Sequence, residues 1–314
     1  MQEVFNRYIN YLEAERNVSP YTVRNYTNDL TGNYKRGSEK GFFQFLRLKE
    51  IDDLGEVDKR TLRNYISWLM KQGVAKASIA RKLSAIRSFY RYLAREEILP
   101  NNPLREASAP KLDRRLPSFL TIKETVRLLK APDLTGPQGL RDRAIIELIY
   151  ASGLRVSELV KLNLEQINFD SGQIRVWGKG SKERVVLIGK PAVMALVNYI
   201  SRGRSKLMDK KSGNALFLNR YGSRLSERIV QMILEKYTAL AGLDKRVYPH
   251  LLRHTFATHM LDGGADLRVV QELLGHTNLA STQIYTHVTK SQAKKVYLSA
   301  HPMASKKDEE LEKG

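Results

Sequence analysis

The sequence contains no cysteine in its 314 residues, and this absence excludes several kinds of chemistry at once. Disulfide scaffolds, thiolate zinc sites and thiol nucleophiles all need cysteine, so hydroxyl, carboxylate or imidazole groups must carry any reaction. The sequence also lacks an uncharged apolar run of about 18 residues and has no apolar signal-peptide core near its N-terminus. We therefore expect a soluble cytoplasmic protein.

Negative charge is scarce as well. The chain has 33 Asp and Glu residues against 53 Lys and Arg residues, which gives a formal charge of +20. Up to residue 117 there are 22 basic and 14 acidic side chains, and after it there are 31 and 19, so both parts are basic. A polyanion is the expected partner. Nucleic acid is the usual one, but charge alone leaves a membrane surface or an acidic protein open.

The length favours two domains, because a single core seldom grows beyond roughly 250–300 residues. Four prolines, at 100, 103, 110 and 117, interrupt the helical periodicity and predict a linker over 103–117. We therefore expect a helical first domain over 1–102, a second domain over 118–298 and a charged tail over 299–314.

Apolar periodicity predicts three helices in the first domain, over 20–30, 59–71 and 76–95. Ser19 followed by Pro20 is typical of an N-cap with proline at the first helical position. The third helix has an apolar stripe at three- and four-residue spacing, formed by Ile79, Leu83, Ile86, Tyr90 and Leu93.

Ten basic residues and no carboxylate lie between Lys59 and Arg95. A solvated helical face is the more common origin of such a charge run, but solvated faces usually mix both signs. The missing acids favour a surface that faces phosphate groups. The candidate DNA contacts on it are Arg81, Lys82, Arg87 and Arg91.

The second domain is predicted to be mainly helical with one small antiparallel sheet. Two β-branched runs, 173–177 and 184–188, are joined by the basic turn Gly178-Lys-Gly-Ser-Lys-Glu183, a pattern typical of a hairpin. Helical patterns surround them at about 121–130, 141–151, 156–161, 226–241, 250–262 and 266–273.

Common cofactor motifs are absent, so we predict no metal and no other cofactor. His250 and His254 are four residues apart, but the glutamate of HExxH is missing and Arg253 between them would repel a cation. The Gly-rich turn does not match GxxxxGK[ST], and no GxSxG motif occurs.

Several remaining polar residues each allow a structural and a functional interpretation. Arg155 follows a glycine break between two helices, so it either points into a cleft or caps a helix. His250 and Arg253 share one face near a helix N-terminus, where they either bind phosphate or are ordinary surface groups. His276 follows a glycine C-cap, and Tyr285 is one of fifteen tyrosines.

Four segments in order remove much of this ambiguity: SGLRVSEL (152–159), GKGSKER (178–184), HLLRHTFATHML (250–261) and LLGHTNLASTQIYTH (273–287). Together they resemble the catalytic domain of tyrosine site-specific recombinases, the phage integrase family, and most closely its Xer branch. The resemblance covers residues 118–298 and extends more loosely to the helical part before them. It implies a helical, SAM-like core-binding DNA-binding domain followed by an α+β catalytic domain.

The resemblance also implies a reaction, in which a tyrosine oxygen attacks a DNA phosphodiester, forms a 3′-phosphotyrosyl link and releases a 5′-hydroxyl. A general base is needed, because a phenol with a pKa of about 10 is a poor nucleophile at neutral pH. Neither metal nor ATP takes part. By position in the motifs, the nucleophile is Tyr285, the base His250, the general acid Lys179, the phosphate ligands Arg155, Arg253 and His276, and a supporting group Glu158, with Lys182 as a further DNA contact.

Members of this family act as homo- or heterotetramers on two DNA sites and exchange strands through a Holliday junction, sometimes with a DNA translocase. We expect a nucleoid-associated recombinase that resolves chromosome dimers. A mobile-element integrase or transposase and a non-catalytic DNA-binding regulator remain alternatives. The basic segment 31–41 departs from the family pattern, and we expect the tail 299–314 to dock on a neighbouring protomer.

Overall fold

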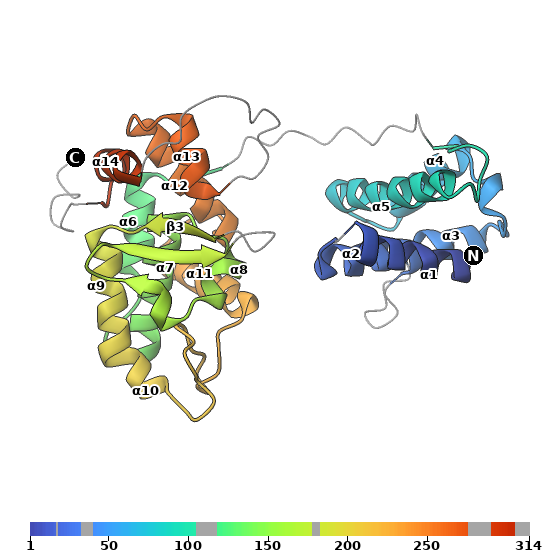
Figure 1. Cartoon of the computed structure of the whole chain (residues 1–314). Coiled ribbons are helices and arrows are strands. Elements are labelled where there is room, and N and C mark those ends of the chain that lie inside the picture. Colours follow the sequence, from blue (N-terminus) through green and yellow to red (C-terminus); the bar gives the residue numbers. More distant parts are fainter. Residues whose placement is uncertain (17, 33–39, 105–117, 178–182, 276–289, 305–314) are drawn as a thin grey trace. The chain divides into compact units, whose positions relative to one another are not determined.

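A computed structural model describes the chain except residues 17, 33–39, 105–117, 178–182, 276–289 and 305–314. The chain divides into two compact units, Met1–Leu116 and Pro117–Gly314. One unit is helical, and the other surrounds a small sheet with helices (Figure 1). No helix in the described residues is long and apolar enough to cross a membrane.

The first unit contains the three helices predicted from the sequence. Ser19 caps the first of them, since its side chain accepts a hydrogen bond from the Thr22 backbone N–H at 3.3 Å. Two further helices in this unit, at Gln2–Asn10 and Phe42–Leu48, were not predicted from the sequence. In chain order the elements are α1 (Gln2–Asn10), a π-helical turn (Tyr11–Glu15), α2 (Pro20–Thr31), α3 (Phe42–Leu48), a 3-10 turn (Leu54–Glu56), α4 (Lys59–Lys71) and α5 (Lys76–Arg95).

The predicted stripe of α5 is the centre of this unit, because all five of its apolar side chains are buried. Aromatic side chains from α1 and α3 pack edge-on against it: the ring centroids of Tyr8 and Phe43 lie 5.2 and 5.5 Å from that of Phe89. The apolar side of α5 faces the core, and Arg91 on another side of the helix is exposed.

Lys82 was predicted to contact DNA, but the structure buries it inside the first unit. Its side chain is buried, its ammonium donates to the Lys40 carbonyl at 2.9 Å, and it lies 3.4 Å from the carboxylate of Asp29. Asp29 is only 1% exposed and also pairs with Arg81, whose side chain is 45% exposed. A buried carboxylate is costly unless it is paired, so Lys82 neutralises Asp29 inside the unit instead of facing a ligand.

The second unit confirms the predicted class, mainly helical with a small antiparallel sheet. The sheet has the order β1 (Ile167–Asn168), β2 (Gln173–Trp177) and β3 (Glu183–Leu187), with Ile174 opposite Val186 and Trp177 opposite Glu183. The helices are α6 (Ile122–Lys130), α7 (Pro137–Ser152), α8 (Val156–Lys161), α9 (Lys190–Asn198), α10 (Ser205–Leu207), α11 (Glu227–Leu240), α12 (Pro249–Asp262), α13 (Leu267–Leu274) and α14 (Lys290–Ala300).

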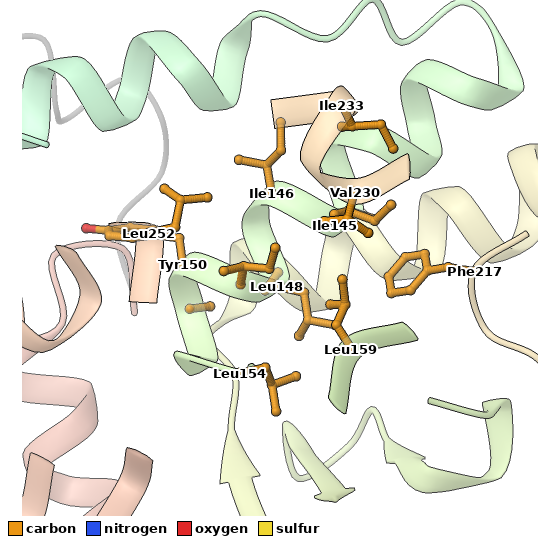
Figure 2. Close-up of a cluster of buried hydrophobic side chains, with 14 of the residues drawn as sticks. Ile145, Ile146, Leu148, Tyr150, Leu154, Leu159, Phe217, Val230, Ile233 and Leu252 are labelled. Carbon is orange, nitrogen blue, oxygen red and sulfur yellow. The ribbon is translucent and has the colours of Figure 1, made fainter. Parts of the chain in front are cut away.

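Helix α7 is the centre of the second unit and is buried on nearly all sides. Figure 2 shows its side chains Ile145 and Leu148 among Leu159 and Phe217 from the surrounding elements. Helix α7 is covered by α9, by α12 and by the helical turn after α9, and its charged residues Arg141 and Asp142 pair with each other inside the unit. The C-terminal end of α7 is therefore held in a fixed place, and Arg155 follows it directly.

The last helix packs on its own chain. The Tyr297 hydroxyl accepts a hydrogen bond from the Gly189 backbone at 2.9 Å, and His301 contacts the Tyr150 carbonyl at 3.3 Å. His301 and Ala304 are buried. The first residues of the predicted tail thus belong to the second unit of the same chain, whereas residues from 305 onward lie outside the described part.

Candidate active site

The turn between α7 and α8 brings Arg155 into the site. Gly153 ends α7 in the left-handed region, with a φ of 59°. A Cβ at this position would lie 2.7 Å from side-chain atoms of both Leu274 and Phe256, so the turn needs glycine for its conformation and for its close contacts. Arg155 then occupies the N-cap position of α8 with a side chain that is 35% exposed.

Arg253 reaches the same turn from α12. Its guanidinium donates through Nη1 to the carbonyl of Gly153 and through Nη2 to the carbonyl of Leu274, the latter at 2.6 Å. The side chain is only 7% exposed. Burial, and then the nearby charge of Arg155, lower the pKa of Arg253 to about 10, so it keeps its charge at neutral pH.

The two arginines meet at the end of α13. Arg155 donates through Nη2 to the Gly275 carbonyl at 3.3 Å, next to the Leu274 carbonyl that Arg253 binds. These protein acceptors use two of the five N–H groups of each guanidinium. Two planar cations with further donors, held by rigid helix ends, are suited to binding one phosphate.

Glu158, which the resemblance gives a supporting role, binds Arg155. Its carboxylate accepts from the Arg155 backbone N–H at 2.8 Å and from Arg155 Nη1 at 3.0 Å. Burial would raise the pKa of this carboxyl, but the hydrogen bonds from Arg184 and Arg155 outweigh burial and leave the pKa below its usual range. Glu158 is therefore ionised at neutral pH.

Arg184 belongs to the same cluster, and our sequence reasoning did not single it out. Through Nη1 and Nη2 it donates to the two carboxylate oxygens of Glu158, at 2.8 and 2.9 Å. The only sequence signal for it was its place at the end of the GKGSKER motif. Its ion-pair partner is 26 residues away, and no local pattern shows that pairing.

His250 lies in the first turn of α12, exposed, and three residues before Arg253. This spacing puts both groups near the positive end of the helix dipole. His254 is partly buried. In the part of the chain that the structure describes, no three His, Asp or Glu side chains gather as a metal site would require.

Four predicted site residues, Lys179, Lys182, His276 and Tyr285, lie outside the described residues. The elements next to them are described. Trp177 at the end of β2 pairs with Glu183 at the start of β3, and Lys179 and Lys182 lie between these two residues in the sequence. Gly275, the residue before His276, caps α13 with a φ of 65° and is in contact with Arg184.

Models of two families match the chain. The phage integrase family matches residues 118–292, and the phage integrase N-terminal SAM-like domain matches residues 5–97. The chain belongs to the phage integrase family. Each match falls within one of the two units seen in the structure.

The relatives place the chain in the Xer group of tyrosine recombinases. It is 48% identical over 307 residues to tyrosine recombinase XerC of Pelotomaculum thermopropionicum, covering 95% of this chain and 98% of the relative. It is 38% identical to tyrosine recombinase XerD of Staphylococcus epidermidis, covering 97% of this chain and all of the relative. The predicted enzyme class, a recombinase that breaks and rejoins DNA, is thereby confirmed.

Solved structures agree on the fold. The XerH site-specific recombinase bound to its palindromic difH substrate, in a post-cleavage complex, has a TM-score of 0.68 with this chain at 23% identity. The match covers 91% of this chain and 78% of that one. A likeness at this identity supports the fold, whereas the roles of individual residues must be argued from their chemistry.

Proposed function

We propose that Arg155 and Arg253 bind the scissile phosphate of a DNA recombination site, which Tyr285 attacks in line. The observation that carries this proposal is the convergence of both guanidiniums on the adjacent carbonyls of residues 274 and 275. Negative charge grows on the non-bridging oxygens in the transition state. Fixed cations in a partly buried place stabilise that charge without having to reorganise.

The other catalytic roles are proposed from the positions of the residues in the family motifs. His250, near Arg253 on α12, takes the proton of the tyrosine hydroxyl as the phosphorus–oxygen bond forms. Lys179, in the turn of the hairpin, gives a proton to the departing 5′-oxygen. His276 donates a hydrogen bond to the same phosphate. The phosphotyrosyl link keeps the energy of the broken bond, so a 5′-hydroxyl from another strand can reverse the step.

Two rounds of such exchange connect two DNA duplexes through a Holliday junction. We extend binding of DNA recombination sites to this chain because it is similar over nearly its whole length to the tyrosine recombinases XerC and XerD. We propose assembly as a homo- or heterotetramer on two sites in the nucleoid, with a DNA translocase as a further partner. The basic character of both parts of the chain supports contact of each unit with DNA.

The proposed role in the cell is the resolution of chromosome dimers. Similarity to XerC and XerD over nearly the whole chain supports it. Mapping covalently bound sites across the host genome should give one dominant site near the replication terminus. Sites at the boundaries of a mobile element would favour an integrase instead, and scattered binding without covalent attachment would favour a DNA-binding regulator.

On the first unit we propose Arg81, Arg87 and Arg91 as DNA contacts and leave out the buried Lys82. Arg91 lines a cavity of about 250 Å³ between α2 and α5, together with Arg16 and Arg95. Arg95 is paired with Glu15, whereas no ion pair of Arg91 occurs among the described residues. A cationic cavity with hydroxyl groups from Thr22 and Tyr26 in its lining suits a backbone phosphate.

The Arg91→Ala variant should therefore bind DNA more weakly without cleaving more slowly once it is saturated. Loss of one phosphate contact makes the negative slope of log K against log salt less steep by about 0.9. Arg47→Ala is the matched control, because Arg47 is an exposed arginine on α3, close in sequence to Glu50, Asp52 and Asp53. Equal salt slopes for wild type and Arg91→Ala would remove Arg91 from the interface.

A further inference from the structure

Arg184 is the less exposed of the two arginines that pair with Glu158, with a side chain that is 16% exposed against 35% for Arg155. It extends from the beginning of β3 and binds both oxygens of Glu158, at 2.8 and 2.9 Å. A two-pronged pair of this kind fixes the plane of the carboxylate as well as its position. Glu158 therefore cannot rotate while Arg184 holds it.

The fixed carboxylate in turn holds Arg155. One oxygen of Glu158 receives Nη1 of both Arg155 and Arg184, and the other receives the Arg155 backbone N–H. One carboxylate thus orients two guanidiniums, and burial makes each of these charge-assisted bonds stronger than it would be in water. Removal of Arg184 would free Glu158, and Arg155 would lose a fixed partner.

Arg184 also packs against the residue before His276. A Cβ on Gly275 would lie 2.8 Å from Cδ and Nε of Arg184, so the two residues are in direct contact. The Gly275 carbonyl accepts a hydrogen bond from Arg155. The Nε–H of Arg184 is buried and has no hydrogen-bond partner in the described structure, which is unfavourable. A lysine would avoid that unpaired donor but could not bind both carboxylate oxygens as a planar fork.

We propose that Arg184 is a positioning residue for cleavage, which acts through Glu158 on Arg155 and through Gly275 on the end of α13. It links the hairpin that carries Lys179 to the arginines that bind the phosphate. Arg184 itself does not touch DNA in this proposal. The proposal rests on the proposed function, because it takes Arg155 as a ligand of the scissile phosphate.

Single-turnover cleavage of a nicked DNA site at saturating protein tests this role. Arg184→Gln should cleave about 10–100-fold more slowly than wild type, since a misplacement of about 1 Å can cost that much. Arg184→Lys should recover part of the rate, because it keeps a cation near Glu158. DNA affinity and its salt slope should stay at the wild-type values in both variants. Arg175→Ala is the matched control, as an exposed arginine on the neighbouring strand β2.

A double-mutant cycle separates positioning from a general loss of structure. If Arg184 acts through Glu158, then Arg184→Gln and Glu158→Gln together should cleave no more slowly than the worse single variant. If the rate losses of the two single variants multiply in the double variant, the proposal is overturned. It is also overturned if Arg184→Gln makes the slope of log K against log salt less steep by about 0.9, because Arg184 would then be a phosphate contact. Wild-type rates in Arg184→Gln would also overturn it. None of these outcomes decides whether Tyr285 is the nucleophile, which the Tyr285→Phe variant tests separately, so the proposed function can stand without this inference.

Discussion

Tyr285→Phe should abolish covalent attachment to DNA while leaving DNA binding close to that of wild type. The substitution removes only the hydroxyl oxygen that would form the bond to phosphorus. A suicide substrate, nicked beside the cleavage position, loses the fragment carrying the 5′-hydroxyl and traps the adduct. A denaturing gel then measures attachment, and a native gel measures binding.

Tyr221→Phe is the control, because Tyr221 is a tyrosine of the same unit that is 66% exposed. It should trap DNA like wild type. Equal trapping by Tyr285→Phe and wild type would show that another group is the nucleophile. Tyr150 and Tyr297 are poor substitutes, since burial raises the pKa of each well above the ordinary value for tyrosine.

Regular patterns made much of the fold predictable from the sequence. The helices at 59–71 and 76–95 have the predicted bounds, because their apolar stripes and flanking glycine and basic residues are local signals. Helix α3 was missed, since Phe42-Phe-Gln-Phe-Leu46 is apolar without a helical period. A segment of this kind becomes a helix through burial on all sides, which only the tertiary structure shows.

The errors at charged positions have one common cause. Lys82 is three residues after Ile79 of the apolar stripe, so helix geometry puts it beside the core, but its partner Asp29 lies far away in sequence. Arg184 was overlooked because its partner Glu158 is also distant in the sequence, 26 residues earlier. Charge patterns indicate that a segment is basic, and only the fold shows which basic groups are neutralised inside the protein.

The sequence predicts a set of site residues, but it does not predict how they are arranged. Motif order indicated Arg155 and Arg253, whereas their shared attachment to carbonyls 274 and 275 depends on how α7, α12 and α13 meet. A left-handed glycine at 153 allows that meeting, and its contact with Phe256 could not be read from the chain. Every residue has a backbone carbonyl, so the sequence does not indicate which carbonyls accept hydrogen bonds from the two arginines.

Arg253→Ala should slow cleavage by about 10²–10³-fold or more at saturating DNA. The variant loses a fixed cation where negative charge develops, and removal of one such donor has an effect of that size. It also leaves the carbonyls of Gly153 and Leu274 without their donor, so some loss of thermal stability is expected. Cleavage and unfolding must therefore be measured on the same preparation.

Arg204→Ala separates the two effects. Arg204 is 5% exposed and donates to the carbonyls of Ala215 and Gly213, both at 3.0 Å, so it resembles Arg253 in burial and bonding but lies outside the site. It should lower thermal stability without slowing cleavage by the folded protein. A DNA substrate with a methylphosphonate at the cleavage position lacks the negative charge of the phosphate. The rate defect of Arg253→Ala should be smaller on this substrate, because less negative charge has to be stabilised by a cation. A defect of the same size on both substrates would mean that Arg253 supports the fold and does not stabilise the charge on the phosphate.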